Sequence, residues 1–300
     1  MEKAEWFAVD WGTSNLRVWA MGAGGRVISQ ETSDKGMGVL RPDEFEPALL
    51  ELIGDFLGED PAEVLCCGMV GARQGWVEAP YAVVPRRPTG IDNTLEVQVN
   101  DPRIMVKILP GVMQKTPADV IRGEETQIAG FVAKNRDFTG TICLPGTHTK
   151  WVRIRRGEIV CFSTFMTGEL FALTSQQSVL QHSVGGKEWS RTAFEEAVFE
   201  VIHTPARFAQ SLFGIRAEGL LGDPKPGVAR ARLSGLLIGL ELAGSVAYWK
   251  DQDVVLIGAP ELTALYARAL DQVEVPNRAF SGDEMTLAGI KAAFKALKET

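Results

Sequence analysis

Hydrophobic and polar residues alternate along residues 7–19, FAVDWGTSNLRVW, in the manner of two β-strands joined by a tight turn. The first strand ends near Asp10, and Gly12, Thr13 and Ser14 form the turn. A carboxylate beside a glycine turn, whose main-chain amides and hydroxyls point outward, suits a hydrated metal ion with a phosphate group behind it. The pattern therefore predicts a hairpin that binds phosphate and a metal ion.

The same pattern occurs twice in the chain. AVDWGTSNLRVWAMGAGGRVISQ (8–30) and ICLPGTHTKWVRIRRGEIVCFS (142–163) both read as strand, Gly-Thr turn, strand, Gly turn and strand. Gly12 corresponds to Gly146, which lies 134 residues later. Asp10 corresponds to Leu144, so only the first turn carries a carboxylate. One Mg²⁺ ion needs one such anchor, and contact through water is compatible with its hydration shell.

Similar elements follow each copy of this pattern. After the first copy, apolar periodicity predicts helices at 43–57 and 124–135 and strands at 64–67 and 104–109. After the second copy it predicts helices at 168–182, 190–212, 234–244 and 284–299, and a strand at 254–257. Two similar α/β domains facing each other would form a cleft with one Gly-Thr turn on each wall.

A strand-turn-helix at 254–270, VVLIGAPELTALYARAL, offers a third nucleotide-binding element. Gly258 and Ala259 follow the strand, where a glycine lets adenine or ribose approach the main chain, and Pro260 fits the first helical position. Ordinary interpretations remain open for these motifs. Aspartate before glycine is common turn chemistry, and many strand-to-helix connections carry Gly and Pro. The phosphate signatures GxxxxGK[ST] and GxGxxG are absent.

Composition narrows the class of protein. With 300 residues, 45% of them hydrophobic and 23% charged, the chain suits a soluble globular protein of one large or two medium domains. A formal charge of −7 without a Lys/Arg cluster argues against nucleic acid as a partner. The N-terminus lacks a targeting pattern, and Glu241 interrupts the most apolar segment, 233–249. We expect a cytoplasmic protein whose cysteines, which form no C-x-x-C pair, are reduced core residues.

Together these motifs resemble the two phosphate motifs and the adenosine motif of the sugar kinase, hsp70 and actin superfamily. More narrowly, six blocks in order resemble the 2-dehydro-3-deoxygalactonokinase family over nearly the whole chain. These blocks are GMVGARQGW (68–76), APYAVVP (79–85), RGEETQIAG (122–130), LPGTHTKW (144–151), FMTGELF (165–171) and SGLLIGLE (234–241).

The resemblance implies a fold and a reaction. The fold is α/β, with two similar RNase H-like domains of the actin-like ATPase fold and an ATP/substrate cleft between them. The N-terminal lobe would span 1–137, joined by the C-terminal helix 283–300, and the nucleotide-binding lobe would span 138–282. The reaction is ATP-dependent phosphorylation of 2-dehydro-3-deoxy-D-galactonate at its terminal (C6) hydroxyl, within galactonate catabolism.

Such a kinase needs a base for the attacking alcohol. Glu124 is our candidate, with Glu125 in reserve, because the last helix of the first domain borders the cleft in this superfamily. Many relatives have an aspartate there, and acids are favoured in the first turn of any helix by its dipole. A structural role for both glutamates therefore stays open.

The remaining site residues follow from the same motifs. Arg73 would pair with the substrate carboxylate, while Gln74 and Trp76 border the sugar acid. A surface arginine beside a packed tryptophan stays open as the alternative. Asp10 would hold Mg²⁺. The predicted ATP-binding residues are Gly12, Thr13, Ser14, Asn15, Gly146, Thr147, His148, Thr149, Gly258 and Ala259.

Two other functions fit these residues. One is a kinase for a related sugar acid such as the gluconate epimer, since a single inverted hydroxyl is not legible from sequence. The other is an actin- or hsp70-like ATP-driven conformational switch without small-molecule transfer. The predicted ligands are ATP, Mg²⁺ and a small sugar acid, without nucleic acid or membrane, and a homo-oligomer is an open option.

Overall fold

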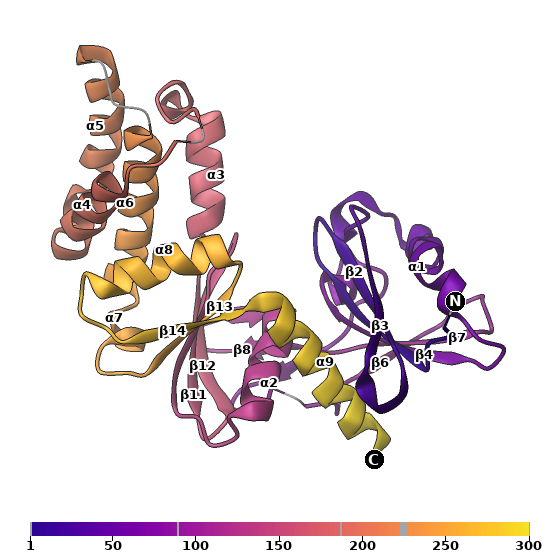
Figure 1. The fold of residues 1–300 in the computed structure, drawn as a ribbon. Helices are drawn as coiled ribbons and strands as arrows, with labels where there is room; N and C mark the ends of the chain where they lie inside the picture. Colours follow the sequence, from indigo (N-terminus) through magenta and orange to yellow (C-terminus); the bar gives the residue numbers. More distant parts are fainter. Residues whose placement is uncertain (1, 89, 187, 223–226, 300) are drawn as a thin grey trace. The chain divides into compact units, whose positions relative to one another are not determined.

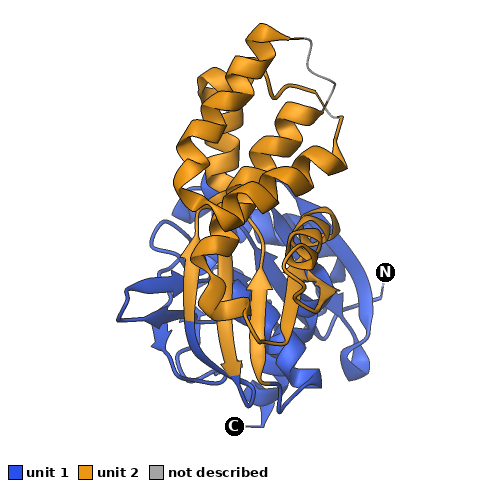
Figure 2. Ribbon diagram, turned by 90° about the vertical axis from the view of Figure 1, so that its left-hand side faces the viewer, with its two compact units in different colours: residues 1–138, 155–161, 282–300 blue, residues 139–154, 162–281 orange. Residues whose placement is uncertain are grey.

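The computed structural model describes residues 2–88, 90–186, 188–222 and 227–299. The chain divides into two compact units, which Figure 2 shows in different colours. Unit 1 comprises residues 1–138, 155–161 and 282–300, and unit 2 comprises residues 139–154 and 162–281. Each unit is built around its own mixed β-sheet.

The sheet of unit 1 has the strand order β3-β2-β1-β4-β7-β6. Its strands, of which all but β1 are labelled in Figure 1, are β1 (Trp6–Trp11), β2 (Leu16–Met21), β3 (Val27–Ser33), β4 (Ala62–Gly68), β6 (Leu95–Val97) and β7 (Ile104–Ile108). The first three strands are antiparallel, whereas β4 runs parallel to β1 and β7 runs parallel to β4. The predicted hairpin and both predicted later strands are therefore confirmed.

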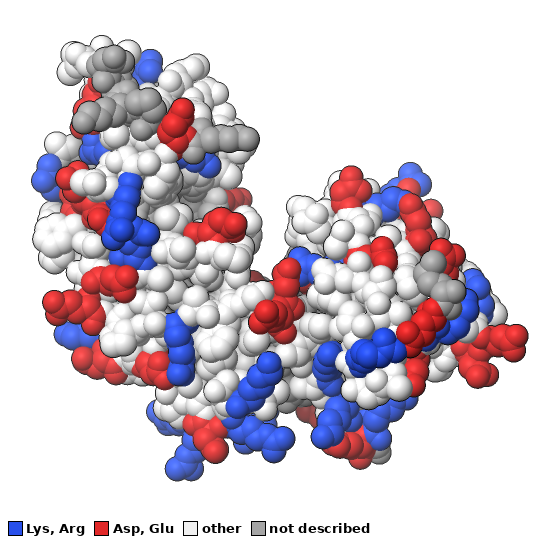
Figure 3. Space-filling model, in the orientation of Figure 1, with Lys and Arg blue, Asp and Glu red and all other residues white. Residues whose placement is uncertain are grey.

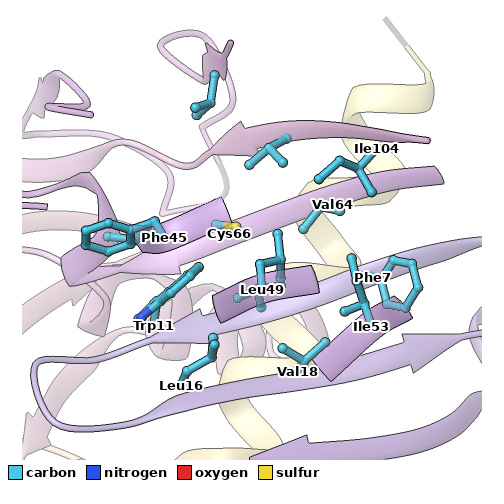
Figure 4. Close-up of a cluster of buried hydrophobic side chains, with 14 of the residues drawn as sticks. Phe7, Trp11, Leu16, Val18, Phe45, Leu49, Ile53, Val64, Cys66 and Ile104 are labelled. Atoms are coloured by element: carbon cyan, nitrogen blue, oxygen red, sulfur yellow. The ribbon is translucent and has the colours of Figure 1, made fainter. Parts of the chain in front are cut away.

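Alternation along β1 sends its side chains to two different cores. Phe7, Val9 and Trp11 point to the face covered by helix α1 (Phe45–Ile53), where they pack with α1 residues such as Leu49 (Figure 4). Trp6 and Ala8 point to the opposite face and pack against helix α9 (Gly282–Lys298), with Trp6 stacked on Phe294. By the same alternation Asp10 lies on the α9 face, and so does Arg17, its cross-strand neighbour on β2.

Unit 2 repeats this topology with the strand order β12-β11-β10-β13-β14. Its strands are β10 (Gly140–Leu144), β11 (Thr149–Arg155), β12 (Glu158–Phe165), β13 (Val254–Gly258) and β14 (Asn277–Ser281). As in unit 1, an antiparallel triple is followed by a parallel strand beside its first member. The repeat read from sequence is thus confirmed by the pairing of the strands.

Helices complete both units, at positions close to those predicted. Unit 1 also contains α2 (Glu124–Lys134). Unit 2 contains α3 (Thr167–Gln177), α4 (Arg191–His203), α5 (Phe208–Leu221), α6 (Val228–Gly244), α7 (Val246–Trp249) and α8 (Pro260–Asp271). The helix expected over 168–182 ends at Gln177 and is followed by a 3₁₀ turn, and the expected 190–212 segment is two helices.

Several short strands were not predicted. A small sheet in unit 1 joins β5 (Tyr81–Val83), β8 (Gly111–Gln114) and β9 (Asp119–Ile121), and strand β14 was also missed.

All four cysteines are free, and all but the half-buried Cys161 are fully buried. No helix among the described residues is long and apolar enough to cross a membrane. Basic side chains on the face drawn in Figure 3 are interspersed with acidic ones.

Helices α2 and α9 of unit 1 touch through two glycines. A Cβ on Gly289 would lie 1.9 Å from the carbonyl oxygen of Thr126, and a Cβ on Gly130 would lie 2.0 Å from that of Met285. Because the obstructing atoms are main chain, neither contact can be relieved by a change of rotamer. The two helices are therefore packed backbone to backbone.

We predict that Gly289→Ala lowers the free energy of unfolding by at least about 2 kcal/mol, since the helices must separate to admit a methyl group. Gly214→Ala is the matched control. It also replaces a helical glycine, but nothing lies within 4 Å of its Cβ position, so alanine should stabilise the protein by about 0.5–1 kcal/mol. Urea denaturation followed by circular dichroism measures both, and equal stability of the two variants would contradict the contact.

Candidate functional site

The two Gly-Thr turns are held by main-chain hydrogen bonds in the same way. In unit 1 the amide of Gly38 donates to the carbonyl of Thr13 at 2.8 Å, and that of Met37 donates to Gly12 at 2.9 Å. In unit 2 the amide of Glu169 donates to the carbonyl of Thr147, which corresponds to Thr13, at 2.9 Å. The segment after the third strand therefore supports the turn in both copies.

Glycines allow this close support. A Cβ on Gly36 would lie 2.3 Å from the carbonyl carbon of Ser14, and one on Gly168 would lie 2.3 Å from the carbonyl oxygen of Gly146. The turn glycines themselves behave differently. The nearest atom to a Cβ on Gly12 would be 3.5 Å away, and a Cβ on Gly146 would meet nothing within 4 Å.

Neither turn glycine has a positive φ, so neither the backbone nor the packing of its own unit demands glycine there. Open space above a main-chain turn suits a group that must approach the amides closely, as a phosphate does. The side chains of Thr13, Ser14, Asn15, Thr147 and His148 are all exposed around these turns.

Two residues of the second turn have side-chain partners. The Nε2 atom of His148 lies 2.5 Å from Oε2 of Glu169, in the first turn of α3. Thr149 is fully buried, and its hydroxyl lies 2.9 Å from the hydroxyl of Tyr266. The side chain of Thr149 thus faces the interior of unit 2, while its neighbours in the turn face solvent.

An acidic cluster surrounds Asp10 in unit 1. The side chain of Asp10 is 26% exposed, and its Oδ2 lies 3.8 Å from Nη1 of Arg17, which also donates a hydrogen bond to Asp283 at the start of α9. Burial raises the pKa of Asp10; Arg17 lowers it, while the negative charges of Asp283 and Glu124 raise it further. Arg17 thus shares its charge between Asp10 and Asp283, and Glu124 adds negative charge near Asp10, a situation that favours a bound cation.

The two candidate bases occupy different environments at the start of α2. Glu124 is half-buried, and its Oε2 accepts a hydrogen bond from the amide of Arg122 at 3.1 Å. Glu125 is only 3% exposed and accepts hydrogen bonds from the amide of Gly123 at 2.7 Å and the hydroxyl of Thr126 at 3.0 Å. Burial, followed by the charge of Glu124, raises the pKa of Glu125 to about 7.

The predicted substrate loop after β4 is partly exposed and partly structural. Arg73 and Gln74 are exposed. Trp76 is half-buried and packs edge-on against Trp11, with ring centroids 6.1 Å apart, and parallel to Phe45 at 6.0 Å. Trp76 thus joins the loop to the core on the α1 face of the sheet.

Sequence reasoning missed Arg122, which supports this loop from inside. Its guanidinium donates to the carbonyl of Ala79 at 2.8 Å and to the hydroxyl of Tyr81 at 3.3 Å, and it stacks on the Tyr81 ring. Its Nη1 is buried without a hydrogen-bond partner among the described residues. Only its place in RGEET, two residues before Glu124, marks Arg122 in the sequence.

Sequence reasoning also missed a cavity of about 230 Å³ in unit 2. Its lining is mostly apolar: Gly146, Thr167, Gly168, Phe171, Trp189, Arg230, Ser234, Leu237, Ile238, Leu262, Leu265 and Tyr266. It thus includes the first residue of the second turn, but not Gly258 or Ala259. A larger cavity, of about 770 Å³ beside His203 and Trp249, contains none of the predicted site residues.

Comparisons with known proteins agree with one another. The family model described as 2-keto-3-deoxy-galactonokinase matches residues 10–293. A protein named as a probable 2-dehydro-3-deoxygalactonokinase of Rhizobium meliloti is 38% identical over 97% of this chain and 96% of its own length. The 2-dehydro-3-deoxygalactonokinase of Escherichia coli is 35% identical over 98% of this chain and 99% of its own length.

Solved structures confirm the predicted fold class. A Sinorhizobium meliloti crystal structure assigned as a 2-dehydro-3-deoxygalactonokinase superposes with a TM-score of 0.92 at 38% identity, over 97% of this chain and 99% of that one. The activator of the 2-hydroxyisocaproyl-CoA dehydratase from Clostridium difficile, solved with ADPNP, shares the fold at a TM-score of 0.50, with 13% identity over 98% of this chain and 97% of that one.

We predict that Glu125→Gln changes how stability depends on pH. Because the pKa of Glu125 rises from 4.5 in the unfolded chain to about 7 in the folded protein, the wild type loses stability as pH rises through this window. Glutamine does not titrate, so the variant should gain on the wild type between pH 4.5 and 7, by up to about 3 kcal/mol.

Urea unfolding at pH 5 and pH 8 measures this difference. Glu78→Gln, which neutralises an exposed carboxylate, controls for the loss of one charge. A stability difference between Glu125→Gln and the wild type that is the same at both pH values would show that Glu125 does not titrate in this range.

Proposed function

Because this chain belongs to the 2-keto-3-deoxy-galactonokinase family, we propose that it transfers the γ-phosphoryl group of ATP to the C6 hydroxyl of 2-dehydro-3-deoxy-D-galactonate. Membership of the family makes the chain a carbohydrate kinase that acts on a small molecule, and it favours this activity over an ATP-driven switch. The observation that carries the assignment of roles is the open space above Gly12 and Gly146, the two turn glycines.

In this proposal the two turns bind the phosphate groups of ATP. The amides of residues 12–15 and 146–149 supply hydrogen-bond donors, and the exposed hydroxyls of Thr13, Ser14 and Thr147 add to them. The cavity beside Gly146 takes the adenine ring, since it is mostly apolar and adjoins the second turn. Gly258 and Ala259 stay our candidates for contact with the nucleoside.

Mg²⁺ fits the donor set around Asp10. Carboxylate oxygens are the ligands that this ion prefers, and Asp283 and Glu124 add negative charge near Asp10. Among the described residues no group of three or more His, Cys, Asp and Glu side chains forms a metal cage. In the proposed site the ion is held by one or two carboxylates together with the nucleotide phosphates, the usual arrangement for Mg²⁺ in phosphoryl transfer. When bound, the ion would neutralise the phosphate charge.

Glu124 is the proposed general base. Its half-buried carboxylate can be reached from outside, whereas Glu125 has both oxygens engaged inside unit 1. Glu124 accepts the proton of the C6 hydroxyl as the oxygen attacks the γ-phosphorus. Glu125, through the amide of Gly123, holds the first turn of α2 in place.

Two arginines are candidates for the substrate carboxylate. Arg73 is exposed on the predicted loop beside Gln74. The inner Arg122 is a buried cation, and its Nη1 has no hydrogen-bond partner in the described part of the chain. Trp76 supports the loop rather than projecting from it. Arg73→Lys and Arg122→Lys, compared for the KM of the sugar acid, identify which side chain recognises it.

The function is tested with ATP, Mg²⁺ and a panel of 2-keto-3-deoxy sugar acids, followed by identification of the phosphorylated carbon. We predict that the galacto epimer is the best substrate and that Glu124→Gln lowers kcat by about 10²-fold or more while binding ADP normally. Glu125→Gln serves as the matched variant. A larger loss of kcat in Glu125→Gln would transfer the role of base to that residue, and ATP hydrolysis indifferent to every sugar acid would refute the kinase.

We also predict that Gly146→Ala weakens ADP binding by about tenfold or more without loss of stability, because its methyl group would occupy only the space reserved for phosphate. Gly185→Ala is the matched control, since nothing lies within 4 Å of that Cβ position either and residue 185 is outside the turn. Calorimetric titration with ADP and thermal denaturation give the two readouts. Unchanged ADP affinity in Gly146→Ala would remove the second turn from the phosphate site.

A further inference from the structure

Glu241 is a buried carboxylate to which the proposed chemistry gives no role. It lies near the end of α6, is 2% exposed, and accepts hydrogen bonds from three different elements. The indole of Trp151 on β11 donates to Oε1 at 2.7 Å, and the hydroxyl of Tyr266 on α8 donates to Oε2 at 2.8 Å. The hydroxyl of Thr167, the first residue of α3, also donates to Oε2.

All the hydrogen-bond partners of Glu241 among the described residues are neutral donors. No Lys, Arg or His side chain of the described ranges forms an ion pair with Glu241, so its charge is balanced by hydrogen bonds alone. A carboxylate buried in this way is costly, and an apolar residue at the same place on this apolar helix would avoid the cost. We therefore expect the Glu241 carboxylate to have a functional role and not only to fill space in the core.

The hydrogen-bond directions connect Glu241 to the second turn. A tyrosine hydroxyl has one proton, and that of Tyr266 is donated to Glu241. Tyr266 therefore accepts in its contact with the Thr149 hydroxyl, 2.9 Å away, and Thr149 is also among the hydrogen-bond partners of Glu241. Thr149 is thus connected to Glu241 both directly and by a relay through Tyr266, and these contacts fix the rotamer of the residue that closes the turn.

The same carboxylate is also connected to the start of α3 and to the 230 Å³ cavity of unit 2. Thr167 precedes Gly168, whose main chain lies against the carbonyl of Gly146. Thr167 and Tyr266 both line the 230 Å³ cavity, as does Ile238, which is three residues before Glu241 on α6. The side chain of Glu241 thus connects the second turn, the start of α3 and helices α6 and α8, which line the cavity.

We infer that Glu241 is the positioning residue of the nucleotide-binding part of unit 2, which comprises the second turn (residues 146–149) and the 230 Å³ cavity. Glu241 touches neither phosphate nor base, but it holds the turn and the cavity in the arrangement that binds both. This inference rests on the proposed function, since it assumes that ATP binds at residues 146–149. According to this inference, Glu241 determines the affinity for the nucleotide, whereas Glu124 in unit 1 determines the rate of the chemical step.

Glu241→Gln tests the inference. Glutamine has nearly the same shape, but its NH₂ group cannot accept the hydrogen bonds that one carboxylate oxygen receives. We expect the Kd for ADP and the KM for ATP to rise about tenfold or more, while kcat at saturating ATP and the KM for the sugar acid change less than about threefold.

Glu46→Gln is the matched control. Glu46 on α1 is likewise a buried carboxylate, 8% exposed, and it accepts hydrogen bonds from the amides of Asn100 at 2.8 Å and Asp101 at 2.7 Å. Since it lies in unit 1 and away from the acidic cluster, Glu46→Gln should lower stability without changing the Kd for ADP.

Tyr266→Phe gives a second, milder variant. It keeps the carboxylate but removes the relay to Thr149, so the Kd for ADP should again rise, by about threefold or more. If Glu241→Gln does not fold, this variant decides the question. Wild-type affinity for ADP in a folded Glu241→Gln, or in Tyr266→Phe, would overturn the inference. ADP binding does not require a sugar acid, so a failure of the proposed kinase reaction in the wild type is a separate result.

Discussion

The structure depends on the close approach of main chain to main chain at each Gly-Thr turn. Gly36 and Gly168, after the third strands, lie against the turns from one side. Gly68 and Gly258, at the ends of β4 and β13, lie beneath them, where a Cβ would come within 2.7 Å of the Trp11 carbonyl oxygen and 3.3 Å of the Pro145 carbonyl oxygen. Trp11 and Pro145 each precede a turn glycine, so both copies place a strand-end glycine against the residue before the turn, more tightly in unit 1 than in unit 2. With no side chain at these contacts, the amides of the turn are held directly by neighbouring main chain, which preorganises them for an anion.

The two copies differ in what surrounds that common support. In unit 1, alternation along β1 and β2 turns Asp10 and Arg17 toward the start of α9, where Asp283 and Glu124 add negative charge. In unit 2 the position of Asp10 is Leu144, and the turn is instead backed by an apolar cavity and the network around Glu241. The same main-chain frame is thus built twice; in the proposed function it binds phosphate in both units, while metal and proton chemistry belong to unit 1 and nucleotide recognition to unit 2.

Much of this architecture can be predicted from the sequence because it follows from local periodicity. The alternation of residues 7–19, the helical spacing of α1 and the repeated Gly-Thr turn each lie within a short window. Strand β14 was missed because NRAFS has no apolar alternation and is barely buried. Glu241 was noted only as an interruption of an apolar helix, since two of its partners, Trp151 and Thr167, are 90 and 74 positions away. Such a network is a property of the tertiary fold.

The choice between the two glutamates of α2 shows why burial must be weighed before pKa. A base works best when its pKa is near the working pH, and by that measure alone Glu125, at about 7, would be preferred. Successive helical residues, however, point about 100° apart, and here Glu125 faces the interior while Glu124 lies partly at the surface. The burial that raises the pKa of Glu125 is the same burial that keeps a substrate hydroxyl from it. Glu124 remains reachable, and its negative charge raises the pKa of both Asp10 and Glu125. A proton delivered to Glu124 would therefore relieve repulsion across the whole cluster, which supports its proposed role as the base.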